Sequence, residues 1–526
     1  MEPTLSFFKP WVPEWLVRST IFLALIPGSI LLALYGATTA DAAGYYGIQP
    51  SDVQFSLLLY YAGLVAYLPF DPRFSSYLPS RQYFIWALFL LVVSVVLCTL
   101  THHVYVLYLL RFIQGCLCSA IGSPCLTLIF SRLHSTRARA MGYTFFYGAL
   151  LAAAPLSAIV ASLTLDRFNF PVVFHVFLLL QLPGGLLLIL ILNDVRLKRR
   201  LPLSQLEWPS FVLLSGALAL AAYVLVYGQE REWLSDPSIL GALAGLLGLA
   251  FLFGLRQHRL RRPYINLAIF RYRGFRRGLA LFVLFYLCRG TTNIATAYFL
   301  NILHLDAYHL ASLQLATLAG IAAGMLVVVR FVLVGAPLRS ISVVGFGLML
   351  AYHGSMYFLL GPTQSTTVFL LPLFLHGLAT GTLMVPLIGY TLSSLPSHLG
   401  GSGSYAAVTV RFATYSGSMA LTSYLQLAWR SAHFERLRQE IVPENFLLTS
   451  RLQHYQQGLQ SRGLGPEAAE HAALGLLRNA LEAQSELRFA MGYHALVSGG
   501  LVVLLAVLIL LPHVQERLVS FRQRPL

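Results

Sequence analysis

Three arginines, Arg111, Arg289 and Arg411, lie inside long apolar stretches of this sequence. A cation at the centre of a bilayer costs at least about 2.5 kcal/mol, so an arginine there normally faces a wet cavity or a partner. None of the twenty acidic residues lies at the centre of an apolar stretch. We therefore expect the arginines either to face a substrate-binding cavity or to bond backbone carbonyls of neighbouring helices.

Other polar residues share the helical faces of these arginines, because residues three or four positions apart lie on one side of a helix. The pattern predicts a cavity near the membrane midplane, with Arg111 and Gln114 on its N-terminal wall. The candidate substrate-binding residues are Arg111, Gln114, Tyr286, Arg289, Asn293, Arg411 and Tyr415.

Three titratable residues are candidates for proton coupling: His353 and His376 within apolar stretches, and Asp41 at the end of one. Histidine is the side chain whose ordinary pKa lies closest to physiological pH. The alternative is an anionic substrate that exchanges or runs down its own gradient. All five cysteines lie in apolar segments, so we expect buried thiols and predict no metal site and no cofactor.

The elements that position these residues follow from composition. The chain is 57% hydrophobic and 11% charged, with a mean hydropathy of +0.70, whereas a soluble protein carries about 25% charged residues. A bilayer core needs roughly 20 apolar residues of helix, and in lipid the backbone must satisfy its own hydrogen bonds. We predict an all-α polytopic membrane protein with fourteen transmembrane helices near 17–38, 53–70, 82–101, 104–130, 139–163, 171–192, 208–228, 238–256, 278–301, 309–334, 340–360, 366–395, 403–429 and 491–512.

Charge predicts the orientation of these spans. With the N-terminus inside, the cytoplasmic segments hold 24 of the 36 lysines and arginines, and the short outer loops hold only Arg167 and Arg231. Basic residues favour the cytoplasmic side, so both termini are predicted to be cytoplasmic. The net charge of +16 lies in these loops, which argues against nucleic acid as a partner and for contact with membrane lipid.

The predicted spans divide the chain into parts. Residues 17–192 would form an N-terminal six-helix bundle, residues 193–277 basic linkers with two extra transmembrane helices, and residues 278–512 a C-terminal six-helix bundle. Residues 430–490 are the largest polar region and read as an extracytoplasmic helical insertion before the last span.

Several strings resemble a known family. Arg111-Phe112-Ile113-Gln114-Gly115 resembles the RxxQG motif of major facilitator transporters. The segment from Arg262 to Phe275 resembles the start of the second half in the fourteen-helix drug:proton antiporters, the EmrB-type multidrug exporters, and Val385-Pro386-Leu387 with Ser393–Pro396 resembles their twelfth span. The first span lacks the acid that is usual in that branch, so the resemblance does not imply a first-span proton carrier.

The resemblance implies a major facilitator fold and a multidrug efflux antiporter in the bacterial inner membrane. We expect a secondary transporter that exports neutral or anionic amphiphilic small molecules by alternating access. Three buried cations without an acid disfavour cationic substrates. The resemblance also implies a periplasmic adaptor protein that residues 430–490 could bind; alternatively, these residues form a self-packed cap over the outer vestibule. A receptor or scaffold of the same fold and a lipid-modifying enzyme are the rival functions.

Overall fold

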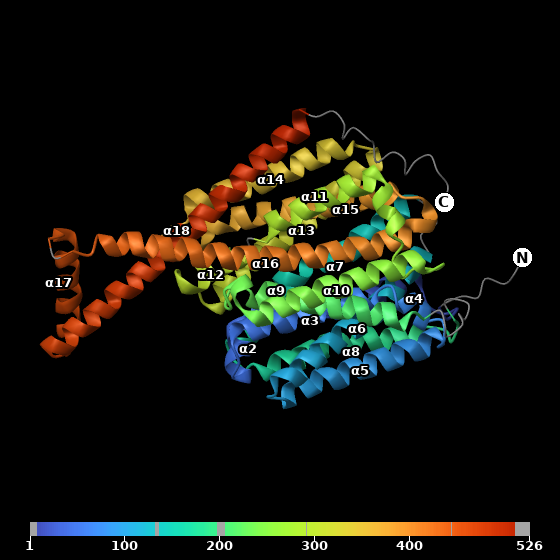
Figure 1. Ribbon diagram of the computed structural model, residues 1–526, viewed down its shortest axis with the longest axis horizontal. Helices are drawn as coiled ribbons and strands as arrows, with labels where there is room; N and C mark the ends of the chain where they lie inside the picture. The colour runs from blue at the N-terminus through green and yellow to red at the C-terminus, as the bar shows by residue number, and fades with distance from the viewer. Residues whose placement is uncertain (1–7, 132–135, 197–205, 291, 443, 511–526) are drawn as a thin grey trace, which may run out of the picture.

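The computed structural model describes residues 8–131, 136–196, 206–290, 292–442 and 444–510, and these form helices joined by short connections (Figure 1). The described residues contain no strand, only an isolated antiparallel bridge between Phe8 and Leu192. The expectation of an all-helical membrane protein is confirmed: within the described ranges, twelve helices are long and apolar enough to cross a membrane.

Two packed groups of helices make up the bundle, and we call them the N-lobe and the C-lobe. The N-lobe consists of α1 (Glu14–Ala37), α2 (Thr39–Tyr46), α3 (Pro50–Tyr67), α4 (Asp71–Phe74), α5 (Ser80–Leu100), α6 (Val104–Ser131), α7 (Thr136–Leu165) and α8 (Pro171–Ile191). The C-lobe consists of α11 (Arg273–Arg289), α12 (Thr292–Asn301), α13 (Ala307–Val334), α14 (Leu338–Leu359), α15 (Leu370–Ser393), α16 (Gly400–Gln439) and α18 (Pro466–Leu510).

The lobes meet chiefly where α7 packs on α13 and where α3 packs on α16. Two further helices lie beside this junction: α9 (Trp208–Tyr227) packs on α3 and α16, and α10 (Pro237–Arg259) packs on α9. We call the end of the bundle that holds residues 192–196, 206–210 and 256–275 the linker end.

At the opposite end α16 and α18 continue beyond the bundle as a helical arm, and α17 (Phe446–Gln460) lies across its tip (Figure 1). The arm grows out of the spans themselves. With 45 residues, α18 is about 68 Å long at 1.5 Å per residue, so its inner half crosses the bundle and its outer half builds the arm. We call this end the arm end.

Two helices that were predicted to span the membrane, α3 and α16, are not among the twelve. Polar residues lower their hydropathy: α3 carries Asp52, Gln54 and three tyrosines, and α16 is rich in serine and threonine. Both nevertheless pack inside the bundle, α3 against α6 and α9, and α16 against α11 and α18. The count of fourteen spans depends on these two helices and stays a prediction.

Glycines set the closest helix contacts. A Cβ on Gly320 of α13 would lie 2.1 Å from the carbonyl oxygen of Phe374, and one on Gly377 of α15 would lie 2.1 Å from that of Thr317. Small residues at four-residue spacing let helix backbones approach in this way. Gly115, the last residue of the RxxQG string, serves the same purpose between α6 and α3, because its Cβ would lie 1.9 Å from the Tyr60 carbonyl oxygen.

Candidate functional site

Two cavities lie between the lobes, one toward each end of the bundle. The linker-end cavity has a volume of about 310 Å³ and the arm-end cavity one of about 270 Å³. Each approaches the size of a small-molecule site. Leu150 of α7 and Arg411 of α16 line both cavities, so these two side chains form the partition between them.

A contact between the lobes holds this partition together. Arg411 is 7% exposed, and its Nε donates a hydrogen bond to the hydroxyl of Tyr61 on α3. The guanidinium carbon lies 5.2 Å from the centre of the Tyr61 ring, and that ring packs on Phe412 and Tyr415. Arg411 and Tyr61 therefore join the C-lobe to the N-lobe where the cavities meet.

Arg289 lies at a break in a transmembrane segment. Helix α11 ends at Arg289 and α12 begins at Thr292, and at Gly290 an added Cβ would lie 2.2 Å from the Ser418 hydroxyl oxygen. A glycine is thus needed where α16 passes the break. Discontinuous helices of this kind often build substrate sites in transporters, and here the break places Arg289 on the wall of the arm-end cavity.

The structure brings five of the seven candidate substrate-binding residues together. Tyr286, Arg289, Asn293, Arg411 and Tyr415 all line the arm-end cavity. Among the described residues, the guanidinium of Arg289 has no ion-pair partner and lies 6.0 Å from the centre of the Tyr286 ring. No aspartate or glutamate lines either cavity in the described part of the chain, so the fixed charge of the site is positive.

Arg111 and Gln114 line neither cavity, which corrects the expectation that they form its N-terminal wall. Both are fully buried in the N-lobe. The Arg111 side chain donates to the Gln114 amide oxygen at 2.9 Å and to the Leu31 carbonyl at 3.3 Å. Its guanidinium also lies 4.2 Å and 4.6 Å from the ring centres of Tyr35 and Tyr60. The Arg111 guanidinium thus interacts inside the N-lobe, where it links α6 to α1 and α3.

The N-lobe wall of the arm-end cavity is built instead by Gln54, Leu57 and Tyr61 of α3, with Leu32 and Ala33 of α1. Sequence reasoning missed Gln54 and Tyr61. The low hydropathy of α3 was the signal that could have found them, because a polar span is tolerated in a membrane where it faces a cavity.

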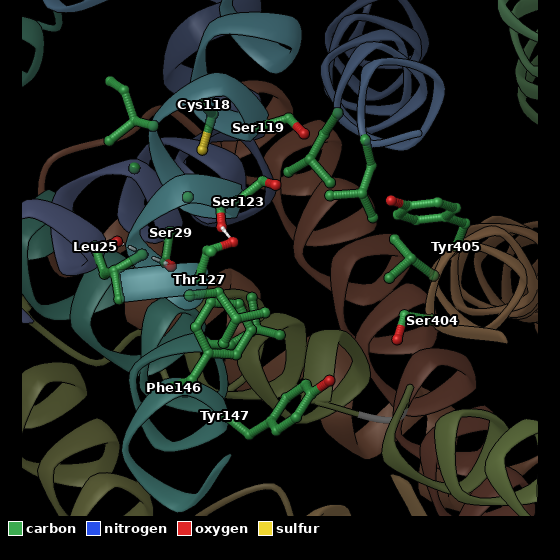
Figure 2. Close-up of a pocket in the computed structure, with 18 of the residues that line it drawn as sticks. Leu25, Ser29, Cys118, Ser119, Ser123, Thr127, Phe146, Tyr147, Ser404 and Tyr405 are labelled. Atoms are coloured by element: carbon green, nitrogen blue, oxygen red, sulfur yellow. Dashed lines mark hydrogen bonds between the residues drawn. The ribbon is translucent and has the colours of Figure 1, made fainter. Parts of the chain in front are cut away.

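The linker-end cavity is lined mainly by apolar and aromatic side chains (Figure 2). Leu25, Phe146 and Tyr147 come from the N-lobe, and Tyr405 faces them from α16. Several small polar residues of α6 lie on the same wall, among them Ser119, Ser123 and Thr127. This cavity therefore suits an amphiphilic molecule.

The histidines predicted to couple protons lie outside both cavities, in the C-lobe core. His353 of α14 and His376 of α15 are at most 3% exposed and flank Tyr352. A third histidine, His494 of α18, joins them: its Nδ1 lies 3.0 Å from Nδ1 of His353. The other ring nitrogen of His353 lies 3.2 Å from the Cys288 carbonyl.

This geometry assigns the tautomers of the histidine pair. A carbonyl only accepts, so His353 donates from Nε2; when both rings are neutral, its Nδ1 then accepts from the Nδ1–H of His494. The remaining Nε2 of His494 then carries a lone pair and has no partner among the described residues. Asp41, the third coupling candidate, is exposed on α2 at the arm end. It belongs to the N-lobe, whereas the three histidines lie in the C-lobe.

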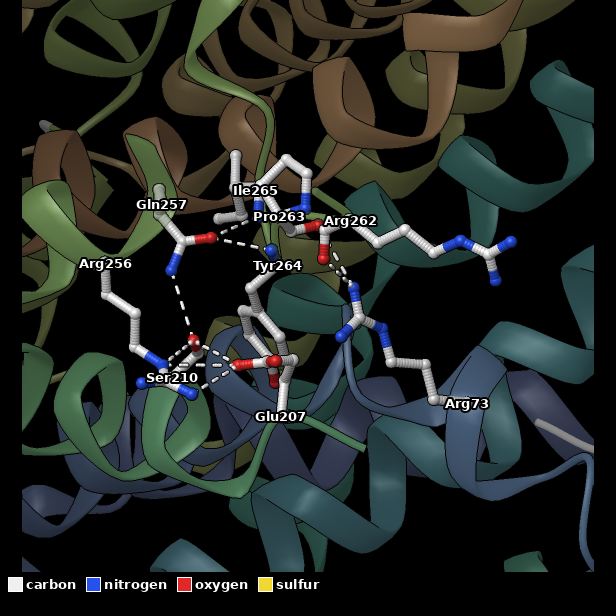
Figure 3. A network of polar contacts seen from close by, with 9 residues as sticks. All are labelled: Arg73, Glu207, Ser210, Arg256, Gln257, Arg262, Pro263, Tyr264 and Ile265. Atoms are coloured by element: carbon white, nitrogen blue, oxygen red, sulfur yellow. Dashed lines mark hydrogen bonds and ion pairs between the residues drawn. The ribbon is translucent and has the colours of Figure 1, made fainter. Parts of the chain in front are cut away.

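A polar network ties the linker to the N-lobe at the linker end (Figure 3). The Gln257 side chain accepts from the amides of Tyr264 and Ile265 at 2.6 Å and 3.2 Å, and the Tyr264 hydroxyl donates to the Ala66 carbonyl at 2.7 Å. Arg73 donates to the Pro263 carbonyl at 3.0 Å.

The same linker also reaches the other lobe. The amide of Asn266, two residues after Tyr264, donates to the Ser402 hydroxyl of α16 at 3.1 Å. In the same network, Arg256 of α10 pairs with Glu207 at 3.0 Å (Figure 3). Relative movement of the lobes must therefore strain or rearrange this segment.

Comparison with known proteins agrees with this architecture. The Major Facilitator Superfamily model matches residues 19–419. The drug efflux pump JefA of Mycobacterium tuberculosis is 24% identical over 315 residues, which is 59% of this chain and 60% of that pump. The multidrug export protein EmrB of Haemophilus influenzae is 23% identical over 381 residues, 69% of this chain and 70% of that protein. This chain thus spans about three fifths of the length of the first of these relatives.

Solved structures share the fold at low sequence identity. The peptide transporter POT in complex with sulfate has a TM-score of 0.57 at 11% identity, with 95% of each chain covered. The human organic anion transporter MFSD10 (TETRAN) has a TM-score of 0.51 at 14% identity, covering 90% of this chain and 100% of that one. Two helical lobes around a shared central site, together with a family model that matches most of the sequence, show that this chain belongs to the Major Facilitator Superfamily of membrane transporters.

Proposed function

We propose that this transporter exports anionic or neutral amphiphilic molecules across the bacterial inner membrane by alternating access. The observation that carries the proposal is that Arg289 and Arg411 line a cavity between the lobes in which no described carboxylate faces them. A desolvated ammonium group would find no countercharge there, whereas an acid would find two cations in a poorly hydrated site.

The acid group would bind between the two guanidiniums, and the apolar body would lie along the aromatic walls. Arg411 keeps its two terminal nitrogens for a carboxylate while its Nε is held by Tyr61, and a guanidinium binds a carboxylate most strongly through two parallel hydrogen bonds. Because Arg411 lines both cavities, a rocking motion of the lobes would expose the same cation to either end.

The orientation of the protein in the membrane supports export as the direction to test first. The linker end carries the arginines of residues 256–277, and an excess of basic residues marks the cytoplasmic side. With this proposed orientation, the linker-end cavity would lie toward the cytoplasm and the arm would lie outside. The relatives named as a drug efflux pump and a multidrug export protein agree with this direction.

The arm is proposed to bind a periplasmic adaptor protein. It extends away from the bundle (Figure 1), which disfavours a cap folded over the cavity. Phe446 and Leu447 at the start of α17 are 79% and 77% exposed, and exposed apolar side chains at a tip suit a protein contact. If a variant lacking residues 443–487 still co-purified fully with its adaptor, the arm would have no such role.

Proton coupling is proposed to run through the histidines, with His353 and His376 as the first candidates and Asp41 as the third. The support is that His353 is bonded to the Cys288 carbonyl, directly beside Arg289 in the chain. If His353→Gln and His376→Gln both leave the pH dependence of transport unchanged, this route fails and Asp41→Asn becomes the remaining variant to measure.

The test of the proposed function is flux in proteoliposomes. An apolar acid, its neutral amide and an apolar amine of the same size should be transported in the order acid, amide, amine. Simple cations as the best substrates would refute the proposal. Binding of the acid without any flux would instead favour a receptor of the same fold.

A further inference from the structure

The N-lobe wall of the linker-end cavity holds two buried polar side chains, each with an oxygen that has no hydrogen-bond partner among the described residues. Gln181 of α8 is 1% exposed and Ser119 of α6 is 4% exposed, and both line the cavity. The amide oxygen of Gln181 and the hydroxyl oxygen of Ser119 have no hydrogen-bond partner within the described residues. Buried polar groups are satisfied in most proteins, so an unsatisfied pair on one cavity wall asks for an explanation.

Neighbouring hydroxyls on the same wall do not share this property. The Ser29 hydroxyl donates to the Leu25 carbonyl at 3.2 Å, and the Thr127 hydroxyl donates to the Ser123 carbonyl at 3.1 Å (Figure 2). These side chains satisfy themselves on their own helices, as serine and threonine commonly do. Gln181 and Ser119 thus differ from Ser29 and Thr127, because the Gln181 oxygen and the Ser119 hydroxyl have no such bond among the described residues.

The opposite wall of this cavity supplies the cation. Arg411 comes from α16 in the C-lobe, whereas Gln181 and Ser119 come from the N-lobe. Between them the lining is largely apolar and aromatic, with Phe146 and Tyr147 on one side and Tyr405 on the other. The cavity therefore offers a charged point and a neutral polar point, one on each lobe, separated by an apolar surface.

We propose that this cavity is a two-point site for hydroxylated organic anions: the acid binds Arg411 and a hydroxyl at the far end of the molecule binds Gln181 and Ser119. A hydroxyl suits both groups on this wall, because it can donate to an acceptor such as the Gln181 oxygen and accept from a donor such as the Ser119 hydroxyl. The inference rests on the proposed function, since it names the class of substrate within the same central passage.

Recognition by both lobes would also link binding to movement. A ligand that holds Arg411 on one lobe and Gln181 on the other favours the arrangement of the lobes in which both contacts form. A ligand can shift a conformational equilibrium only through such differential contacts. A deoxy analogue would engage the C-lobe alone and should therefore bind less tightly.

The experiment uses four probes that separate the two points: 6-hydroxy-2-naphthoate, 2-naphthoate and the corresponding amides of both acids. Equilibrium binding to the full-length protein in nanodiscs is followed by naphthalene fluorescence, with empty nanodiscs subtracted. For the unaltered protein we expect the hydroxyl to raise affinity about five- to tenfold, and the acid to bind more tightly than its amide.

Variants should separate the two ratios. In Gln181→Leu and in Ser119→Ala, the ratio of affinities for hydroxylated and plain acid should fall close to one. The ratio of affinities for acid and amide should stay unchanged. Arg411→Gln should instead lower the ratio of affinities for acid and amide and leave the ratio for hydroxylated and plain ligands unchanged. Ser342→Ala is the matched control, because Ser342 of α14 is likewise a buried serine with an unpartnered hydroxyl but lines neither cavity.

Each outcome decides one of the two proposals. Equal affinity for hydroxylated and plain acids would overturn the two-point site, as would loss of all four ligands in Gln181→Leu at unchanged thermal stability. Equal affinity would also show that water or nearby protein groups already form hydrogen bonds with Gln181 and Ser119. Failure of the unaltered protein to prefer acids over amides would overturn the anion site on which the inference rests.

Discussion

Replacing Arg289 by glutamine should separate function from stability in this transporter. The guanidinium of Arg289 has no ion-pair partner among the described residues and lies on the wall of the arm-end cavity. A hydrogen bond to a charged group is worth about 1.5–3 kcal/mol. Taking about 2 kcal/mol, the affinity of the arm-end cavity for an acid that binds between Arg289 and Arg411 should fall about thirtyfold, whereas its affinity for the matching amide should change little.

The fold should not suffer from the same change. An arginine near the middle of a membrane costs at least about 2.5 kcal/mol where nothing compensates it, and removing it leaves no described side chain without its partner. We therefore expect the melting temperature of Arg289→Gln to equal or exceed that of the unaltered protein. Loss of function at undiminished stability is typical of a residue kept for its site.

Binding to the protein in nanodiscs and thermal unfolding of the same samples measure both quantities. Arg111→Gln is the control, since Arg111 is a buried cation that lines neither cavity. The folded fraction of that variant should keep the acid-to-amide ratio. An unchanged ratio in Arg289→Gln, or an equal fall in affinity for acid and amide, would refute the assignment of Arg289 to an anion site.

Three further variants test the packing around the site. Tyr61→Phe keeps the ring but removes the acceptor of Arg411, so distance measurements between spin labels on α3 and α16 should show a larger population of separated lobes; an unchanged distribution would contradict a joining role. Gly115→Ala would place a methyl group against the Tyr60 carbonyl, and should lower stability by about 1–3 kcal/mol in thermal or denaturant unfolding. Gln257→Leu would leave two buried linker amides unpaired, which should cost about 2–4 kcal/mol; an unaltered melting temperature would show that the linker is held by other contacts.

Much of the fold could be predicted because membrane spans are encoded locally. Twelve of the fourteen predicted spans correspond to helices that satisfy length and hydropathy alone. The glycine pairs Gly320/Gly324 and Gly377/Gly381 have the small-residue spacing of closely packed helices, and the structure packs them against each other between α13 and α15. The RxxQG string identified its family as well, although its arginine has a packing role here.

The site could be predicted only in part, because helical spacing gives the face of a residue and not what it faces. The polar helical faces of Arg289 and Arg411 lie together on one cavity. The polar face of Arg111 instead contacts Tyr35, a residue 76 positions earlier in the chain. His494 escaped notice for the same reason: its partner His353 is 141 residues away. Long-range partners of this kind leave no periodic signal in a single sequence.

The helices that build the central passage are those that look least like membrane spans. The polar residues of α3 and α16 lower their hydropathy, and α11 and α12 are two short helices in place of one. A bilayer tolerates polar side chains and interrupted backbone only where they face protein or a wet cavity. Tyr61, Arg289 and Arg411 lie on these three segments and meet at one place. In this protein the polar spans α3 and α16 and the interrupted span of α11 and α12 are therefore the ones to search first for a substrate site.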